Sequence, residues 1–373
     1  MITLVDTTLR DGEQAPGAAF TIGEKVEIAK ALSAVGIKEI EAGTPVMGGD
    51  EAEAVKAVIG FVGAPYAVAP TVKIFTWNRV LEKDIEASLS CGAENLYISC
   101  PVSDIQIQNK LRKTRDWVKE RFTKIIPAIK KEGCYAACGL EDASRADVSF
   151  VLEVCRQLEE LQADRIRICD TVGILTPFKT FELIAYIRRH VKIPVEIHTH
   201  NDFGMATANA LAGIKGGAEY ASVTVNGMGE RAGNAALEEV VMTLEKLEGI
   251  KTGVNTKMLK QLSFLVSRFS GRPVAPDKPI VGDMAFNHES GIHVDGVLKE
   301  PSNYEPFFPE EAGNRRGFYI GKHTGQKTLE KLQYITDDKR GLGFGAGLLR
   351  LLRLGYQPVD CSKNGYCGYK DER

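Results

Sequence analysis

The sequence predicts an α/β protein, an eight-stranded (β/α)8 TIM barrel with a small appended C-terminal subdomain. Three observations predict this fold. Short apolar, strand-like runs alternate with helix-like segments from the first residues, many of these runs end in polar residues or glycine, and eight of them fit within roughly 230 residues. No GxGxxG sequence opens an early helix, which disfavours an open dinucleotide-binding sheet.

The predicted strands share a short apolar run bounded by turn-forming or polar residues. In chain order they are Ile2–Thr7, Glu39–Ala42, Thr71–Phe75, Asn95–Ser99, Tyr135–Leu140, Arg165–Cys169, Val195–His198 and Ala221–Val225. Helical spacing between them is seen, for example, in Gly23–Val35, Asp116–Lys131, Ser149–Leu161, Pro177–His190 and Met205–Gly216. We therefore expect the catalytic barrel to occupy residues 1–255.

The alternation of strands and helices stops after about residue 250. Residues 255–270 are predicted to be helical, and residues 271–330 are rich in loop-forming residues. We expect residues 256–335 to form an appended helical and loop subdomain that contributes to the active site of a partner subunit. Residues 336–373 are predicted to be a divergent tail, which we prefer to a regulatory or metal-binding element.

The composition is that of an ordinary soluble globular protein. The chain of 373 residues is 44% hydrophobic and 26% charged, and its net charge of -2 gives no general attraction to nucleic acid or anionic membranes. No signal pattern and no membrane-length apolar run is present in the sequence. The eight cysteines are scattered, which suggests reduced core thiols. We expect a cytoplasmic protein that acts on small molecules.

His198 and His200 are the most informative pair in the chain, which has only six histidines. Both lie at the end of the predicted strand Val195–His198, and alternation places their side chains on the same face. Two imidazoles on one face at the C-terminal end of a strand are well placed to bind a divalent metal ion. The alternative is a pair of hydrogen-bonded polar residues without a metal.

Five predicted strands are followed by polar side chains, and in a barrel all C-terminal strand ends meet at one face. The polar runs are Leu9–Gln14, Glu141–Asp142, Asp170–Thr171, His198–Asp202 and Asn226–Asn234. Because five polar runs all follow predicted strands, we prefer one shared site to the alternative that each run only caps its own loop. The plausible ligands are Asp11, His198, His200 and Asn234. Oxygen and nitrogen donors of this kind suit Mg, Mn or Zn with open positions, and the lack of cysteine argues against a closed structural zinc site.

A metal with open positions can chelate a 2-oxo acid and make its keto carbon electrophilic. Arg10, next to Asp11, is a candidate to stabilise a developing oxyanion, although it could instead form a salt bridge at the barrel mouth. Carbon–carbon condensation also needs a base, for which Glu141 and His293 are candidates. His293 lies in the appended region and could reach a neighbouring subunit's site.

Four sequence runs resemble the 2-isopropylmalate synthase and homocitrate synthase family. They are Asp6–Gly17, His198–Ala206 continued by Asn226–Asn234, His288–Gly296 and Gly321–Gly325. The resemblance covers about residues 1–330 and implies a TIM-barrel acyltransferase that condenses acetyl-CoA with a 2-oxo acid in a Claisen reaction, using a divalent metal. The implied metal ligands are again Asp11, His198, His200 and Asn234.

The resemblance also implies roles for other side chains. Arg10 would polarise carbonyl oxygens, Gln14 would line the site, and Thr171 would hydrogen-bond the carboxylate of the 2-oxo acid. Glu141 and His293 would transfer protons, with Tyr304 nearby, and the family implies that His293 and Tyr304 come from the partner subunit of a homodimer.

The runs Pro101–Asp104, Glu141–Asp147 and Cys169–Pro177 most resemble homocitrate synthases of the nitrogen-fixation type. We therefore expect 2-oxoglutarate as the acceptor and (R)-homocitrate as the product. The alternatives are 2-oxoisovalerate, giving 2-isopropylmalate, and, less favoured, pyruvate or oxaloacetate. A different class is a lyase resembling hydroxymethylglutaryl-CoA lyase. That family has a cysteine in the loop after strand eight, and Asn226–Asn234 contains none.

Overall fold

The computed structural model describes residues 2–62, 72–319 and 323–324 of the chain. The chain divides into two compact units, Met1–Val274 and Ala275–Arg373. The boundary between the units follows Val274, whereas the sequence analysis expects the barrel domain to end at residue 255. The boundary is later because helix α10 (Leu259–Ser270) belongs to the first unit. The predicted tail at residues 336–373 lies outside the described residues.

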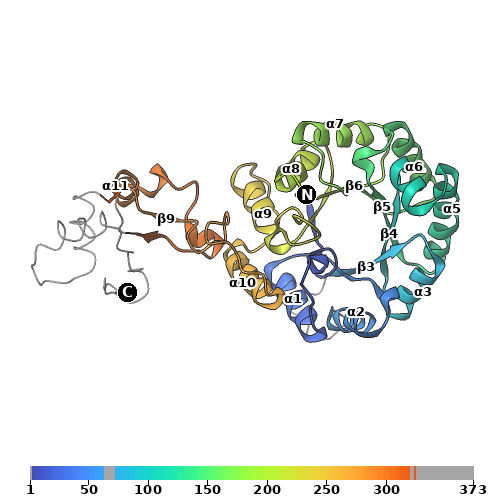
Figure 1. Cartoon of the computed structure of the whole chain (residues 1–373), viewed down its shortest axis with the longest axis horizontal. Helices are drawn as coiled ribbons and strands as arrows, with labels where there is room; N and C mark the ends of the chain where they lie inside the picture. Colours follow the sequence, from blue (N-terminus) through green and yellow to red (C-terminus); the bar gives the residue numbers. More distant parts are fainter. Residues whose placement is uncertain (1, 63–71, 320–322, 325–373) are drawn as a thin grey trace, which may run out of the picture. The chain divides into compact units, whose positions relative to one another are not determined.

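The first unit is the predicted TIM barrel, seen along its axis in Figure 1. Eight strands close in the order β1 to β8, and every neighbouring pair is parallel, including β1 with β8. The strands are β1 Thr3–Asp6, β2 Glu39–Gly43, β3 Lys73–Arg79, β4 Asn95–Pro101, β5 Tyr135–Glu141, β6 Arg165–Asp170, β7 Val195–Thr199 and β8 Tyr220–Val223. All eight predicted strands are present, with ends shifted by a few residues. Thr71 of the predicted third strand lies outside the described residues.

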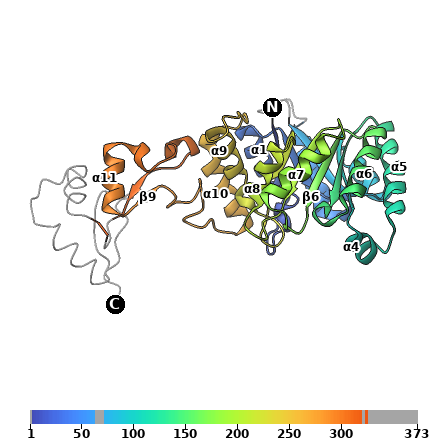
Figure 2. The same cartoon turned by 90° about the horizontal axis from the view of Figure 1, so that it is seen from above.

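Helices surround the barrel, and their starts follow local sequence signals. Thr21 and Glu24 form a capping box at the start of α1, and Thr176 caps α7 just before Pro177. The helices of this unit are α1 Ile22–Val35, α2 Gly49–Val62, α3 Glu82–Ser90, α4 Asp104–Gln106, α5 Arg115–Lys131, α6 Val148–Glu160, α7 Pro177–Arg188, α8 Ala206–Lys215, α9 Leu237–Lys246 and α10 Leu259–Ser270. Figure 2 shows α4, which follows β4, on the opposite face of the barrel from the N-terminus.

The barrel interior has an apolar part and a charged part. Val5, Phe75, Tyr97 and Ala137 form a fully buried apolar cluster. The inward positions of β2, β6 and β7 instead hold charged side chains, and Glu41, Arg167 and Glu196 are at most 1% exposed. A barrel filled by side chains in this way is a packed core, so its open chemistry lies at the strand ends.

The second unit is described over a shorter range. It contains a small parallel sheet of β9 (Asn287–His288) and β10 (Gly317–Phe318), and the helix α11 (Gly291–Lys299). Two of its phenylalanines, Phe286 and Phe307, form an edge-to-face pair with ring centroids 5.4 Å apart. In the described part of the chain, no helix is long and apolar enough to cross a membrane.

Candidate active site

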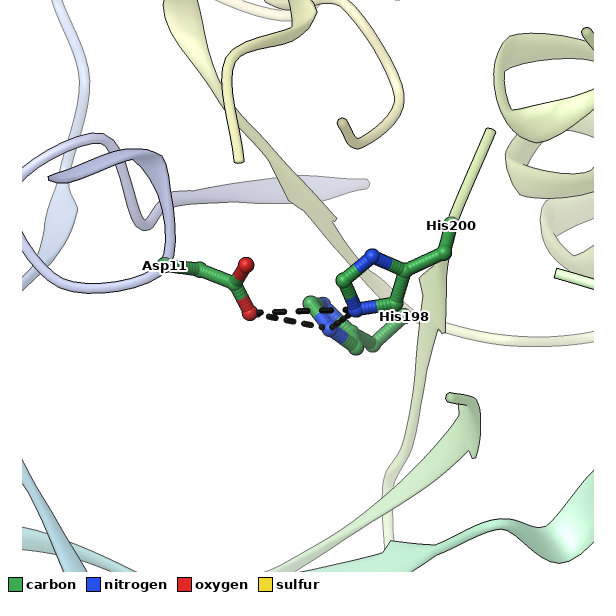
Figure 3. Close-up of side chains that lie close together, drawn as sticks. All are labelled: Asp11, His198 and His200. Atoms are coloured by element: carbon green, nitrogen blue, oxygen red, sulfur yellow. Dashed lines mark hydrogen bonds and ion pairs between the residues drawn. The ribbon is translucent and has the colours of Figure 1, made fainter. Parts of the chain in front are cut away.

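Asp11, His198 and His200 converge at the C-terminal end of the barrel. Figure 3 shows the carboxylate of Asp11 approaching from one side and both imidazoles from the other. The Nε2 atoms of His198 and His200 are 3.3 Å apart, and they lie 3.4 Å and 3.9 Å from Oδ2 of Asp11. The donor atoms of the three residues all lie within 4.8 Å of one another, and all three side chains are buried.

The local fold explains how these side chains meet. His198 is an inward residue of β7, and His200 lies directly after the last residue of that strand, two positions on and on the same face. Asp11 sits at the start of the short 3-10 helix η1 (Gly12–Gln14), which follows β1, and its N–H donates to Oγ1 of Thr7 over 3.3 Å. Strand β8 pairs with β1 on one side and with β7 on the other. Asp11, which follows β1, and the two histidines at the end of β7 therefore lie close in space although they are far apart in sequence.

Asn234 reaches the same place from the loop after β8. It forms an isolated β-bridge with His200, and its Nδ2 donates to Oδ1 of Asp11 over 3.1 Å. Its Oδ1 is buried and has no hydrogen-bond partner among the residues that the structure describes. The loop requires glycine, because a Cβ on Gly229 (φ +153°) would lie 2.1 Å from Nδ2 of Asn234. All four predicted ligand positions are therefore brought together.

The electrostatics of this cluster fit a divalent cation. Burial lowers the pKa of His200 to about 4, helped by repulsion from His198, so this imidazole is neutral near pH 7. Burial alone would raise the pKa of Asp11, but Arg10 and a hydrogen bond with His198 outweigh it and hold that pKa well below its usual value. A carboxylate and neutral imidazoles are the protonation states that bind metal. The unpartnered Oδ1 of Asn234 adds a neutral oxygen donor.

Arg10 is fixed by two buried carboxylates. Its Nε donates to Oε1 of Glu41, and its Nη1 donates to Oδ2 of Asp11 over 2.8 Å. Neither of these two contacts involves its Nη2. The guanidinium carbon lies 5.7 Å from the ring centroid of Trp77. The arginine therefore forms the salt bridge that the sequence left open as an alternative, and these two contacts involve its Nε and Nη1.

Thr171 and Glu141 stand at neighbouring strand ends. The N–H of Asp142 donates to Oγ1 of Thr171 over 2.8 Å, which leaves the hydroxyl proton of Thr171 to donate elsewhere. Glu141 contacts Nζ of Lys110 at 3.0 Å. Arg231, from the loop after β8, donates to the carbonyl oxygen of Thr171 over 2.8 Å.

Arg231 also pairs with Asp202, with its Nε 2.7 Å from Oδ1. It therefore joins the loops that follow β6, β7 and β8. Gly173 allows this close approach, because its φ is +62° and a Cβ there would lie 2.5 Å from Oδ2 of Asp202. Gln14, predicted to line the site, lies in η1 and is exposed.

The remaining predicted residues belong to the second unit. His293 stacks on Tyr304 with ring centroids 4.2 Å apart and an interplanar angle of 22°. The close packing uses Gly296, where a Cβ would lie 2.5 Å from Cε2 of Tyr304. The ring of His288 lies 6.2 Å from that of His293. His293 and Tyr304 thus form a pair within their own unit.

Sequence reasoning missed Glu41, which binds Arg10, and Arg167, which binds Glu41. Glu41 is in the predicted strand Glu39–Ala42, and Arg167 is in the predicted strand Arg165–Cys169. The available signal was the alternation of charged residues in Glu39-Ile40-Glu41 and Arg165-Ile166-Arg167, which places two charges of one strand on one face. Charged residues in central strands are expensive unless they are paired, so they indicate a buried network.

Two family models match the chain. The model described as HMGL-like matches residues 1–266, and the model described as homocitrate synthase post-HMGL domain-like matches residues 280–336. Together the two models cover the barrel and most of the described part of the second unit.

Curated relatives match over most of the chain. It is 51% identical over 328 residues to 2-isopropylmalate synthase 2 of Caldanaerobacter subterraneus subsp. tengcongensis, covering 88% of this chain and 84% of the relative. It is 47% identical to homocitrate synthase 1 of Nostoc sp., covering 89% of this chain and 86% of the relative. It is 45% identical to (R)-citramalate synthase of Methanocaldococcus jannaschii, covering 88% of this chain and 66% of the relative.

Solved structures confirm the fold. The hydroxymethylglutaryl-CoA lyase from Pseudomonas aeruginosa superposes with a TM-score of 0.65 at 24% identity, covering 73% of this chain and 94% of that one.

Proposed function

Because the chain belongs to the HMGL-like family, whose model covers residues 1–266, we propose that it condenses acetyl-CoA with a 2-oxo acid and hydrolyses the resulting thioester. This would make it an acyltransferase that converts the acyl group to an alkyl group on transfer. The cluster of Asp11, His198 and His200 beside Arg10 supports the proposal most strongly. The curated relatives, all three of them synthases, agree with it.

The proposed division of labour follows from the contacts. Asp11, His198, His200 and Asn234 would hold the divalent metal. That ion would supply Lewis-acid polarisation of the keto group. Arg10 would direct its Nη2 to the developing oxyanion. Thr171 would donate its free hydroxyl proton to the acceptor's carboxylate, and Gln14 would line the entrance.

Glu141 and the His293–Tyr304 pair are the proposed proton-transfer groups. Glu141 is at the end of β5, next to Asp142, whose N–H fixes Thr171. We propose that His293 and Tyr304 act in the active site of the partner subunit of a cytoplasmic homodimer. The family resemblance of the run His288–Gly296 supports this assignment.

We propose 2-oxoglutarate as the acceptor, giving (R)-homocitrate and CoA. The match of residues 280–336 to a homocitrate synthase domain and the 47% identity to homocitrate synthase 1 of Nostoc sp. support this choice, as does the resemblance to the nitrogen-fixation type. The second candidate is 2-oxoisovalerate, which the 51% identity to 2-isopropylmalate synthase 2 favours.

The test is release of free thiol from acetyl-CoA by purified protein with Mn or Mg, and with 2-oxoglutarate, 2-oxoisovalerate, pyruvate or oxaloacetate. We expect the highest kcat/KM with 2-oxoglutarate and one CoA per product molecule. Preference for 2-oxoisovalerate would keep the reaction and overturn the acceptor. Cleavage of hydroxymethylglutaryl-CoA without any condensation would instead support the lyase class. An excess of CoA over product would argue against coupled condensation and hydrolysis.

A further inference from the structure

The barrel interior below the active site contains a continuous row of alternating charges. In order from the active site they are Arg10, Glu41, Arg167, Glu196, Arg165 and Glu39. Three arginines thus face three glutamates, and the five members below Arg10 are all at most 4% exposed. Because buried charges are costly unless paired, this row is a balanced ionic network rather than a set of separate ion pairs.

Glu41 is the member that connects the network to the active site. Its Oε1 accepts from Nε of Arg10, and its Oε2 lies 2.8 Å from Nη2 of Arg167. The two guanidinium groups therefore share one carboxylate, one at each oxygen. Glu41 is thus one of the two carboxylates that hold Arg10, together with Asp11, and Arg167 contacts Glu41 from below.

Arg167 is itself held in a defined plane. Its Nε donates to Oε1 of Glu196 over 2.7 Å, and its guanidinium carbon lies 3.5 Å from the ring centroid of Tyr97. The hydroxyl of Tyr97 donates to Oε2 of Glu196 and so fixes the ring as well. A planar guanidinium can bridge two carboxylates while it stacks on a ring, whereas the ammonium of lysine is a point charge that cannot.

We propose that Arg167 is a positioning residue for condensation, which through Glu41 fixes the direction in which Arg10 presents its Nη2. This proposal rests on the role proposed above for Arg10. Arg167, in β6, would thus act without touching the substrate. It is 1% exposed, and its ion pairs are with Glu41 and Glu196, neither of which is a predicted substrate-binding or metal-binding residue. Misplacing a positioned group by about 1 Å is expected to cost roughly 100-fold in rate.

Arg165 offers a matched control on the same strand and the same face. It is fully buried, stacks on Tyr220 with its guanidinium carbon 3.9 Å from the ring centroid, and pairs with Glu39 and Glu196. Its ion pairs within the described residues are with Glu39 and Glu196, not with Glu41. Replacing Arg165 therefore disturbs the same buried network at Glu39 and Glu196, but leaves the direct contacts of Glu41 with Arg10 and Arg167 in place.

The experiment compares Arg167→Lys with Arg165→Lys in the full chain. Crystal structures give the first measurement. We expect the guanidinium of Arg10 to leave Oε1 of Glu41 in Arg167→Lys and to stay in Arg165→Lys. An unmoved Arg10 in Arg167→Lys overturns the proposal, and this result is independent of any activity.

Kinetics give the second measurement. We expect kcat to fall at least about tenfold in Arg167→Lys, with the KM for acetyl-CoA and the affinity for Mn unchanged, while Arg165→Lys stays within about twofold of the wild type. Equal losses in both variants would indicate a general role in core stability and would overturn the proposal. A wild type without condensation activity would contradict the proposed function instead, and the crystal structures would still test the positioning.

If Arg167→Lys does not fold, the double variant Arg167→Gln with Glu196→Gln removes one positive and one negative charge and keeps the network neutral. Its expected outcome is the same displacement of Arg10. Retention of the contact between Arg10 and Glu41 in this variant overturns the proposal as well.

Discussion

The imidazoles of His198 and His200 face each other through their Nε2 atoms at 3.3 Å, with their rings nearly perpendicular at 87°. Neither Nδ1 has a hydrogen-bond partner within the described residues, and both are buried. Both Nε2 atoms also lie within 4 Å of Oδ2 of Asp11, so the three donor atoms are close enough together for the metal ion that we propose they bind.

The first prediction concerns His200. Changing His200 to Ala removes one of the clustered donor atoms. We therefore expect the affinity for Mn to fall at least about 100-fold, which is the size of effect seen when a metal ligand or its supporting residue is lost. We also expect condensation activity to fall below detection. Calorimetric titration with Mn and thiol-release assays are the measurements. Circular dichroism should show an intact fold.

The matched control is His190→Ala, because His190 follows helix α7 and is exposed. Its Nδ1 contacts the carbonyl oxygen of Tyr186 at 2.7 Å. This variant should bind Mn as the wild type does. Undiminished Mn binding by His200→Ala would remove the metal-ligand assignment.

The contrast between His200 and Glu41 shows what the sequence could predict. His198 and His200 are two residues apart at the end of β7, so alternation alone predicted that they lie on one face, and the polar strand ends indicated where a site could be. Glu41 and Arg167 come from β2 and β6, and no local pattern says which side chains meet across a barrel. Similarly, α10 packs beside α1, so the end of the barrel domain depends on a tertiary contact between distant segments.

A second prediction concerns Arg231, which joins Asp202 to the carbonyl oxygen of Thr171. Changing Arg231 to Met should loosen the loop after β6, so we expect the KM for the 2-oxo acid to rise roughly five- to tenfold, about 1–1.4 kcal/mol, with Mn affinity little changed. Steady-state kinetics and Mn titration measure both quantities. Arg188→Met, which breaks a comparable surface ion pair with Glu219, is the control and should leave KM unchanged. An unchanged KM in Arg231→Met would show that the contacts of Arg231 with Asp202 and Thr171 are not needed for binding of the 2-oxo acid.

A third prediction concerns the pH dependence of stability through Asp6. Burial raises its pKa from 3.8 to about 7, against the lowering effect of hydrogen bonds from Thr8. Since the folded-state pKa is above the unfolded one, the folded protein binds the extra proton, and stability from this group is lost as the pH rises from about 4 through 7.

Asp6→Asn removes this titration and keeps an oxygen that can accept from the N–H of Thr8, which contacts Oδ1 of Asp6 at 2.9 Å. We expect the stability of the variant relative to the wild type to be at least about 1 kcal/mol greater at pH 8 than at pH 4, or roughly 1–2 °C in Tm for a chain of this length. Urea denaturation at several pH values measures it. Parallel curves for the two proteins would contradict the raised pKa.

The last prediction concerns His293, which we propose acts in the partner's site. His293→Ala and Arg10→Ala should each be inactive. Unfolding and mixing the two, then refolding them together, should restore activity, because a heterodimer has one site in which both residues are native. With random pairing, half of the dimers are mixed and each has one complete site, so about a quarter of wild-type activity is expected if the proposed homodimer with shared sites is correct. Mixed dimers separated by two different affinity tags supply the measurement. Inactive mixed dimers would place His293 and Arg10 in the same subunit's site, because sharing between subunits is the only arrangement that can rescue two such losses.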